Sequence, residues 1–279
     1  MHKFPVMLGM MMAAVLWQPA YAAELGSRSA KEVLASGNTP EEKGLQVVKE
    51  ADARDFGFGD QQVKLEMVLR NASGQENRRV QRSKTLEMQD PSVGDKTLIV
   101  FDNPRTVKGT AFLTFSKILE ADDQWLYLPS LKRVKRISSK NKSGPFVGSE
   151  FAYEDLSSQE VGKYSYRYVR NESCGALECF VVEYRPKYEY SGYTRLIAWV
   201  DTSEFRLQKV EYYDRKNELL KTLTYDGYKQ YLSKYWRPAH MYMVNHQTGK
   251  STDLHWKEYE FRTGLSAGEF TPDVLRRVK

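Results

Sequence analysis

The chain has 279 residues, with 42 lysines and arginines against 36 aspartates and glutamates, so its formal net charge is +6. It is 41% hydrophobic and 13% aromatic, which excludes a disordered protein and, with 18 tyrosines, favours β-strands. Two cysteines and four scattered histidines are too few for a zinc-scaffolded protein, and we expect neither a metal nor a cofactor.

The first 22 residues are typical of a cleavable signal peptide. Lys3 supplies a short positive region, residues 4–17 form an apolar run, and Ala20 and Ala22 occupy the positions that a signal peptidase recognises. The fourteen-residue run is shorter than the ~20 residues needed to cross a bilayer, which disfavours an uncleaved membrane anchor. We therefore predict cleavage after Ala22, a mature chain of residues 23–279, and export from the cytoplasm.

Export restricts the partners that the positive charge implies. Nucleic acid is not expected as a partner outside the cytoplasm, which leaves membrane surfaces and acidic proteins. An oxidising compartment also favours a disulfide between Cys174 and Cys179, which lie between two strand-like runs. A redox-active pair would need closer spacing, so we interpret this disulfide as a structural clip on a hairpin loop.

Helical signals open the mature chain. Ser29 and Glu32 match a capping box, and so do Thr39 and Glu42. Pro40 at the first helical position and the apolar spacing that follows predict a helix from about Pro40 to Arg54.

After Gly59 the hydrophobic period changes from helix to strand. Val63, Leu65, Met67 and Leu69 alternate with other residues, as in a strand with one covered face. Turn signals separate further runs of the same kind. We predict strands at residues 79–88, 97–101, 110–118, 124–128, 133–137, 164–169, 179–185, 195–201, 206–213, 219–226, 239–246 and 252–261.

About a dozen antiparallel strands with short connections predict a large curved sheet. An open sheet of this size would leave long unpaired edges, so it should curl toward a barrel, and a barrel of ten or more strands leaves room for a ligand. A β-sandwich with a solid core fits the same pattern equally well.

A basic block occupies the middle of the chain. Six cations fall within eleven residues: Lys132, Arg133, Lys135, Arg136, Lys140 and Lys142. A solvated strand face explains them, and strand alternation divides them between two faces. The functional alternative is a docking patch for anionic head groups or an acidic partner. The polar stretch 138–149 that follows carries Phe146 and is a candidate mobile flap.

This block and the chain around it resemble the outer-membrane lipoprotein-sorting proteins, the family related to the periplasmic carrier LolA. The resemblance covers about residue 40 to the C-terminus. Its most specific pieces are Trp125-Leu-Tyr-Leu-Pro129, Arg136-Ile-Ser-Ser139, Gly148-Ser-Glu-Phe151, Tyr153-Glu-Asp-Leu156 and Phe270-Thr-Pro272 with Leu275. The resemblance implies an incomplete β-barrel whose mouth is covered by N-terminal and loop helices and which encloses an apolar cavity. It also implies a periplasmic carrier of lipidated cargo, often beside an inner-membrane exporter of the resistance-nodulation-division (RND) type.

A carrier must offset the free energy of exposing an acyl chain to water, about 0.8 kcal/mol per CH₂, with an apolar lining and needs no catalytic group. Candidates for that lining are the apolar residues in or beside the predicted strands and flap, although each taken alone is more readily explained as core. They are Leu113, Phe115, Trp125, Tyr127, Phe146, Trp199, Tyr242 and Trp256. Transient contact with a membrane surface would accompany loading and release.

Two other functions compete with the carrier. In the first, the protein binds no lipid, has a solid interior, and docks an exporter or envelope complex through its basic block. In the second, it is an enzyme acting on envelope lipids, for which His240, His246 and His255 would form a three-histidine zinc site. The sequence lacks the nucleophile-elbow, phosphate-loop and metalloprotease motifs, so we predict a protein that is not an enzyme and has no catalytic residues.

Overall fold

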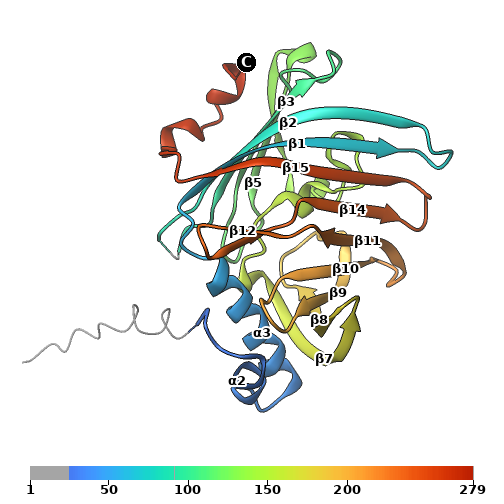
Figure 1. Cartoon of the computed structure of the whole chain (residues 1–279). Coiled ribbons are helices and arrows are strands. Elements are labelled where there is room, and N and C mark those ends of the chain that lie inside the picture. Colours follow the sequence, from blue (N-terminus) through green and yellow to red (C-terminus); the bar gives the residue numbers. More distant parts are fainter. Residues whose placement is uncertain (1–24, 91, 279) are drawn as a thin grey trace, which may run out of the picture.

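The computed structural model describes residues 25–90 and 92–278, and the predicted signal peptide with its cleavage site lies outside them. Thirteen antiparallel strands form one sheet in the order β6-β5-β4-β3-β2-β1-β15-β14-β11-β10-β9-β8-β7. The sheet curves strongly (Figure 1), and β6 and β7 are its two edges, so it does not close. The prediction of an incomplete β-barrel is confirmed, and the β-sandwich alternative is wrong.

Each predicted strand corresponds to an observed strand. The bounds are β1 Asp60–Arg70, β2 Glu76–Leu86, β3 Lys96–Asn103, β4 Ala111–Phe115, β5 Asp123–Leu128, β6 Arg133–Ile137, β7 Tyr164–Cys174, β8 Leu177–Pro186, β9 Tyr193–Asp201, β10 Leu207–Asp214, β11 Leu219–Asp226, β14 His240–Asn245 and β15 Ser251–Phe261. The sequence did not reveal a separate two-stranded hairpin, β12 (Lys229–Tyr231) and β13 (Tyr235–Arg237), because three-residue strands carry almost no periodic signal.

Two helices lie at one end of the curved sheet, beside β7 (Figure 1). They are α2 (Ala30–Ala35) and α3 (Pro40–Asp55), and both predicted capping boxes are formed. Gly44 lets α3 approach the backbone of β7, since a Cβ at this position would lie 2.7 Å from the Tyr168 nitrogen. Helix α3 thereby covers the barrel end.

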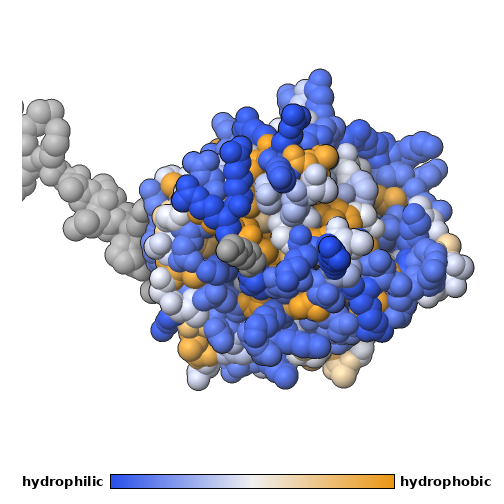
Figure 2. Space-filling view, turned by 90° about the horizontal axis from the view of Figure 1, so that it is seen from above, coloured by the Kyte–Doolittle hydropathy of each residue, from blue (hydrophilic) through white to orange (hydrophobic). Residues whose placement is uncertain are grey.

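The two faces of the sheet are both partly buried. The concave face carries the main hydrophobic cluster. On the outer face, residues 262–278 cross strands β2–β6 and bury a second cluster through Phe270 and Leu275. This C-terminal segment contains two short 3₁₀ helices, η6 (Ala267–Glu269) and η7 (Val274–Arg276). Seen from above, the molecule presents mostly hydrophilic residues with hydrophobic ones exposed between them (Figure 2).

Cys174 and Cys179 form the predicted disulfide, with Cα atoms 5.9 Å apart, across the turn between β7 and β8. Within the described residues, no helix combines the length and the apolar character needed to cross a membrane.

Candidate functional site

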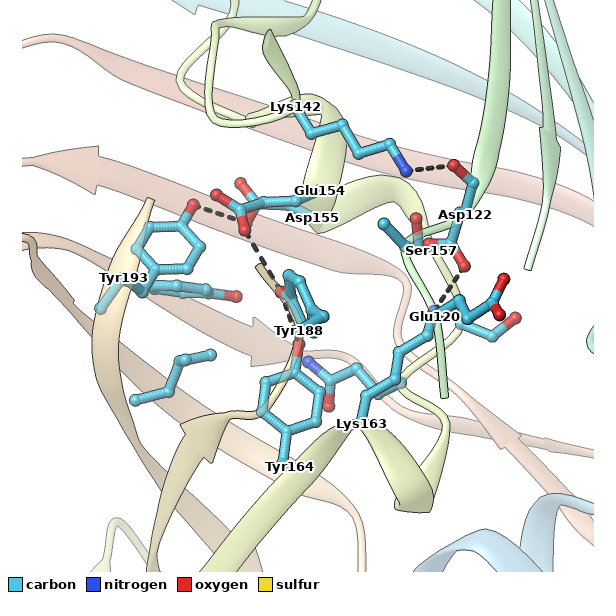
Figure 3. A pocket seen from close by; sticks show the side chains of 15 residues that line it. Glu120, Asp122, Lys142, Glu154, Asp155, Ser157, Lys163, Tyr164, Tyr188 and Tyr193 are labelled. Carbon is cyan, nitrogen blue, oxygen red and sulfur yellow. Dashed lines mark hydrogen bonds and ion pairs between the residues drawn. The ribbon is translucent and has the colours of Figure 1, made fainter. Parts of the chain in front are cut away.

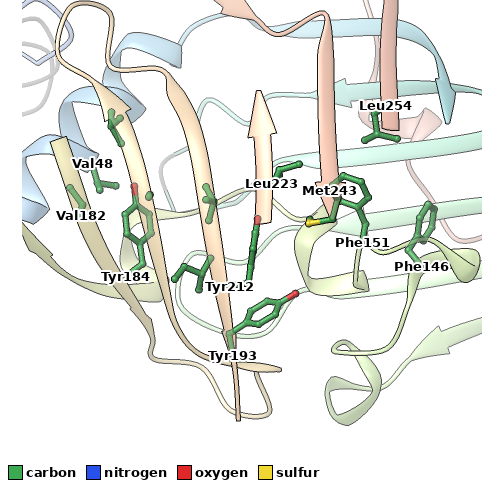
Figure 4. Close-up of a cluster of buried hydrophobic side chains, with 14 of the residues drawn as sticks. Val48, Phe146, Phe151, Val182, Tyr184, Tyr193, Tyr212, Leu223, Met243 and Leu254 are labelled. Atoms are coloured by element: carbon green, nitrogen blue, oxygen red, sulfur yellow. The ribbon is translucent and has the colours of Figure 1, made fainter. Parts of the chain in front are cut away.

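The concave face of the sheet is apolar along most of its strands. Large side chains from β8, β10, β14 and β15 point to the same interior (Figure 4), among them Tyr184, Tyr212, Met243 and Leu254. These four are no more than 5% exposed. The strand alternation places them there, because residues two apart in a strand face the same side.

The inner segment, which we define as residues 138–163, connects the two edge strands β6 and β7. It contains four short 3₁₀ helices: η2 (Ser139–Asn141), η3 (Phe146–Gly148), η4 (Tyr153–Leu156) and η5 (Val161–Lys163). It runs over the concave face and not along the open edges, since its buried residues belong to the main interior cluster. The segment therefore fills part of the interior of the barrel.

Phe146 anchors the inner segment in the interior. Its ring is fully buried and lies 5.1 Å from the ring centroid of Phe112 and 5.8 Å from that of Phe101. The Tyr153 ring packs on Phe112 and Phe146, with centroid distances of 5.5 and 5.7 Å. The chain reverses direction after Phe146, and the Phe146 N–H donates to the Phe151 carbonyl at 2.7 Å across this turn. The turn directs the Phe146 ring inward. The prediction of a mobile polar flap is therefore wrong for the part of residues 138–149 around Phe146.

Two buried ion pairs fix the inner segment to its surroundings, and Figure 3 shows the one between Lys163 and Asp122. Lys221 on β11 lies 2.5 Å from the Asp155 carboxylate and donates to the Glu150 carbonyl at 2.9 Å. Both side chains of this pair are 3% exposed. Lys163 pairs with Asp122 at 2.5 Å, and these side chains are also buried. The polar residues of the segment can enter the interior because their charges are paired there.

Glu154 extends this network to the turn before β9. Its carboxylate accepts hydrogen bonds from the Gly192 N–H at 2.8 Å and from the Ser191 hydroxyl at 3.0 Å. Burial, and next the neighbouring Asp155 charge, raises the pKa of Glu154 to about 6. The contacts of the inner segment therefore involve a group that titrates near neutral pH.

Glu160 is a second carboxylic acid of the inner segment with a shifted pKa. Burial, and next the nearby Asp95 charge, raises the pKa of Glu160 to about 7. Burial also raises the pKa of Asp95, to about 6. At a pH above these pKa values, Glu160 and Asp95 are both ionised, and repulsion between the two carboxylates opposes close packing of the inner segment.

The cavity beside the inner segment is small. The cavity between the inner segment and the strands has a volume of about 30 Å³, enough for one or two waters. Tyrosines of β7, β9 and β10 line it together with Asp122, Glu154, Asp155 and Lys163 (Figure 3). A larger cavity of about 280 Å³ lies on the outer face, where Leu98 and Val100 face Val274 and Val278 of the C-terminal segment and Lys84 and Glu269 stand at its edge.

Most of the predicted cavity residues do not face the interior. Leu113, Phe115, Trp125 and Tyr127 belong to the outer cluster beneath the C-terminal segment. Trp199 packs on the disulfide on the outer side of β8 and β9, and Tyr242 lies opposite Asp253 on the outer face of β14. The prediction that these six line the cavity is wrong, because both faces of the sheet bury aromatic residues. Trp256 and Phe146 do belong to the interior cluster.

The basic block is divided between surface and interior. Lys132, Arg133, Lys135, Arg136 and Lys140 are exposed, and three of these lie on the edge strand β6. Lys142 is buried and donates to the Asp122 carbonyl, so it is not part of a docking surface. The three-histidine zinc site is not formed either, since His246 contacts Thr222 while His240 and His255 stack on each other.

Residues that sequence reasoning missed include Lys221, Asp155 and Gln81. The first two are ordinary charged residues of a predicted strand and a predicted loop, 66 positions apart. Gln81 lies on the concave face of β2, opposite Leu65 and Phe101. Asp155 belongs to the Tyr153-Glu-Asp-Leu156 piece of the family resemblance, but no local pattern marks any of the three as an interior group, because their partners come from distant parts of the chain.

Known proteins resemble the chain over most of its length. A family model with the description "-like: Uncharacterized protein" matches residues 94–277. Comparison with curated proteins gives no match. A solved structure described as an outer membrane lipoprotein-sorting protein domain from Vibrio parahaemolyticus is 54% identical, with a TM-score of 0.83 over 85% of this chain and 100% of that one.

Two further solved structures share the architecture. A DUF1329 family protein from Desulfovibrio piger is 26% identical, with a TM-score of 0.81 over 85% of this chain and 100% of that one. A LolA superfamily protein from Nitrosomonas europaea is 22% identical, with a TM-score of 0.64 over 89% of this chain and 100% of that one, which shows a shared fold. Together with the incomplete barrel, these similarities show that the chain belongs to the outer membrane lipoprotein-sorting protein family and has the LolA-like fold.

Proposed function

We propose that this protein is a periplasmic carrier that binds acyl chains of a lipid or lipoprotein on its concave face and transports them toward the outer membrane. The observation that carries the proposal is an apolar concave face covered by a segment that is not part of the sheet. Family membership supports the same role. We expect no catalysis, because the proposed task requires only binding and release.

The apolar face supplies the binding free energy that such a carrier needs. Withdrawing a sixteen-carbon chain from water is favourable by about 12 kcal/mol, at about 0.8 kcal/mol per CH₂. The concave side chains of β8, β10, β14 and β15 provide a lining that can recover this energy. In this structure Phe146, Phe151 and Tyr153 belong to the same interior cluster, where Phe146 and Tyr153 pack on Phe112 of β4. Cargo and inner segment would therefore compete for one surface.

Binding requires the inner segment to move. Ligand pockets usually enclose ~300–1,000 Å³, whereas the closed interior holds about 30 Å³. Side-chain contacts and scattered hydrogen bonds, such as the one from the Lys187 N–H to the Lys163 carbonyl (2.8 Å), attach the segment to the rest of the fold. Its one isolated bridge, Pro145 to Ala152, lies within the segment, and no strand of the described chain pairs with it. Such an attachment can open without breaking the sheet, and an acyl chain that replaces the aromatic rings would stabilise the open form.

Two buried polar atoms support a bound group with both apolar and polar parts. Gln81 Oε1 and Trp256 Nε1 are buried and have no hydrogen-bond partner within the described chain. Both residues lie opposite Leu65, on the strands to either side of β1, so they belong to one row of the concave face. Buried polar groups are ordinarily hydrogen-bonded, so these two atoms are expected to gain partners from a bound molecule. An amide of the cargo could donate to Gln81 Oε1, and an ester or amide carbonyl could accept from Trp256 Nε1.

The test uses two adjacent residues of β14 that face opposite sides of the sheet. Met241 packs against the interior cluster, whereas Tyr242 faces outward, and both are partly buried. We expect Met241→Asn to weaken binding of a sixteen-carbon fatty acid and of a lipopeptide about tenfold or more, since an amide in an apolar site costs about 1–3 kcal/mol. The matched Tyr242→Asn variant should bind like the wild type.

Native mass spectrometry of gently purified protein supplies the second readout. Lipid-sized adducts on the wild type that are reduced for Met241→Asn agree with the proposal. A protein that neither carries lipid from cells nor binds the two acyl probes contradicts it. Loss of binding in Val274→Asn but not in Met241→Asn would place the acyl chain in the outer-face cavity and overturn the concave-face assignment.

The exposed cations of β6 and the adjoining turns favour a second candidate function, docking to an inner-membrane exporter of the RND type. Arg133, Lys135 and Lys140 carry no ion pair among those found in the described residues, and charge on an edge strand also prevents unwanted strand pairing. Replacing the three by glutamate should abolish co-purification with an exporter while leaving acyl binding intact. If co-purification is unchanged, the three cations do not bind an exporter and serve only to keep the edge strand solvated.

A further inference from the structure

A cluster of histidine and carboxylate side chains lies on the outer face of the sheet, away from the concave face. It consists of His240 on β14 and of Asp253 and His255 on β15. The outward direction follows from strand alternation, since Leu254 and Trp256 between and beyond them belong to the interior cluster. The cluster is therefore separate from the proposed acyl site.

Strand register brings the three residues together. His240 and His255 are direct partners across the β14–β15 ladder, and their rings stack with centroids 4.7 Å apart. Asp253 precedes His255 by two residues, so it lies on the same face at the diagonal position. One ligand atom from each of the three residues lies within 4.8 Å of the others.

The spacing suits a small cation once the two histidine rings turn out of their stack. Ligand atoms that each lie ~2.0–2.2 Å from a zinc ion are at most ~4 Å apart, so the most distant pair must approach by about 1 Å. The rings are nearly parallel, with an interplanar angle of 13°, so side-chain rotation must also aim both nitrogen lone pairs at one point. Two imidazoles and one carboxylate are a donor set that zinc accepts, whereas magnesium and calcium prefer oxygen alone. The side chain of His240 is 25% exposed, which leaves access from solvent and room for a water ligand.

Neighbouring groups orient two of the three side chains, His240 and Asp253. His240 Nε2 points to Asp253 Oδ1 at 2.7 Å, while its Nδ1 lies 2.8 Å from the Asp226 carboxylate on β11. Histidines that bind metals through one ring nitrogen commonly donate the other N–H to a carboxylate in this way. Arg70 occupies the other oxygen of Asp253, which leaves Oδ1 directed at His240.

We propose that His240, Asp253 and His255 form a binding site for a divalent transition-metal cation of the zinc type, with Asp226 orienting His240. A bound ion would replace the direct His240–Asp253 hydrogen bond and link β14 to β15 in the middle of the sheet. This site differs from the three-histidine arrangement considered from the sequence, because Asp253 takes the place of His246.

The test titrates tag-free protein, first stripped with a chelator, with Zn²⁺ alone by calorimetry. We expect one ion per chain, no binding of Mg²⁺, and a rise in Tm of about 5–10 °C when free Zn²⁺ is 100 times Kd. His255→Ala and His240→Ala should each weaken binding at least tenfold, and Asp226→Asn about tenfold through the lost orientation. His246→Ala is the matched control and should bind like the wild type.

Thermal unfolding in the presence of chelator shows whether each variant is folded. If His255→Ala unfolds, His255→Gln serves in its place. A wild-type protein without saturable 1:1 binding, or binding that persists equally in the His240 and His255 variants, would overturn the proposal and leave an ordinary hydrogen-bond network. Acyl binding by the same variants separates this result from that of the carrier proposal, since neither site contains residues of the other.

Discussion

The buried pair between Lys221 and Asp155 provides the sharpest test of how the inner segment is held. Lys221→Met removes the cation and leaves the Asp155 carboxylate in the interior without its charge partner. Both side chains are 3% exposed, and removing one member of a buried pair typically costs about 3–5 kcal/mol. We expect a loss of that size in the free energy of unfolding, and a decrease in Tm of about 6–20 °C for a chain of this size.

Urea unfolding followed by circular dichroism measures the loss, and a double-mutant cycle assigns it to the pair. Asp155→Asn alone should also destabilise, but the double variant should lose less than the sum, by about 0.5–3 kcal/mol. Lys64→Met is the matched control, because Lys64 pairs with Glu258 at 2.7 Å with both side chains more than 60% exposed. An exposed pair contributes about 0–1 kcal/mol.

Hydrogen exchange locates the effect within the fold. We expect Lys221→Met to speed exchange of the amides at residues 146–156, while those of the central strands keep their protection, because the segment opens without the sheet. A loss below 1 kcal/mol for Lys221→Met, or faster exchange spread evenly over the sheet, would refute the interpretation that this pair fastens a separable segment.

Three further predictions concern the packing, the titration and the disulfide. Phe146→Ala should lower the free energy of unfolding by about 3–5 kcal/mol in urea, because the ring is fully buried. A loss under 1 kcal/mol would instead support the mobile, unpacked flap that the sequence predicted. The pKa of Glu160 is raised in the folded state to about 7, so the folded protein binds more protons than the unfolded chain between about pH 4.5 and 7, and its stability should fall as the pH rises through this range. Unfolding curves for Glu160→Gln should show a shallower dependence on pH, and an unchanged slope would contradict the assignment. Replacing Cys174 and Cys179 by serine should lower stability by no more than about 2–3 kcal/mol because the closed loop is short, and a larger loss would mean that the disulfide does more than clip the hairpin.

The sequence by itself determined the elements of this fold. Capping residues at Ser29 and Thr39 marked the helix starts, and the period of two marked every strand of the large sheet, because both signals depend on neighbouring residues. The disulfide was predictable for the same reason, since its cysteines are five positions apart.

Only the tertiary structure decided which face of each strand is the interior. Leu98 through Phe101 are all buried, because the C-terminal segment covers the outer face while the inner segment covers the concave one. Alternation cannot distinguish inside from outside when both faces are apolar, and for this reason Leu113 and Trp125 were assigned to the wrong side. Burial of a polar, lysine-containing segment was equally hidden, since the carboxylates that neutralise Lys163 and Lys221 lie 41 and 66 residues away in the chain and meet them only when the sheet curls.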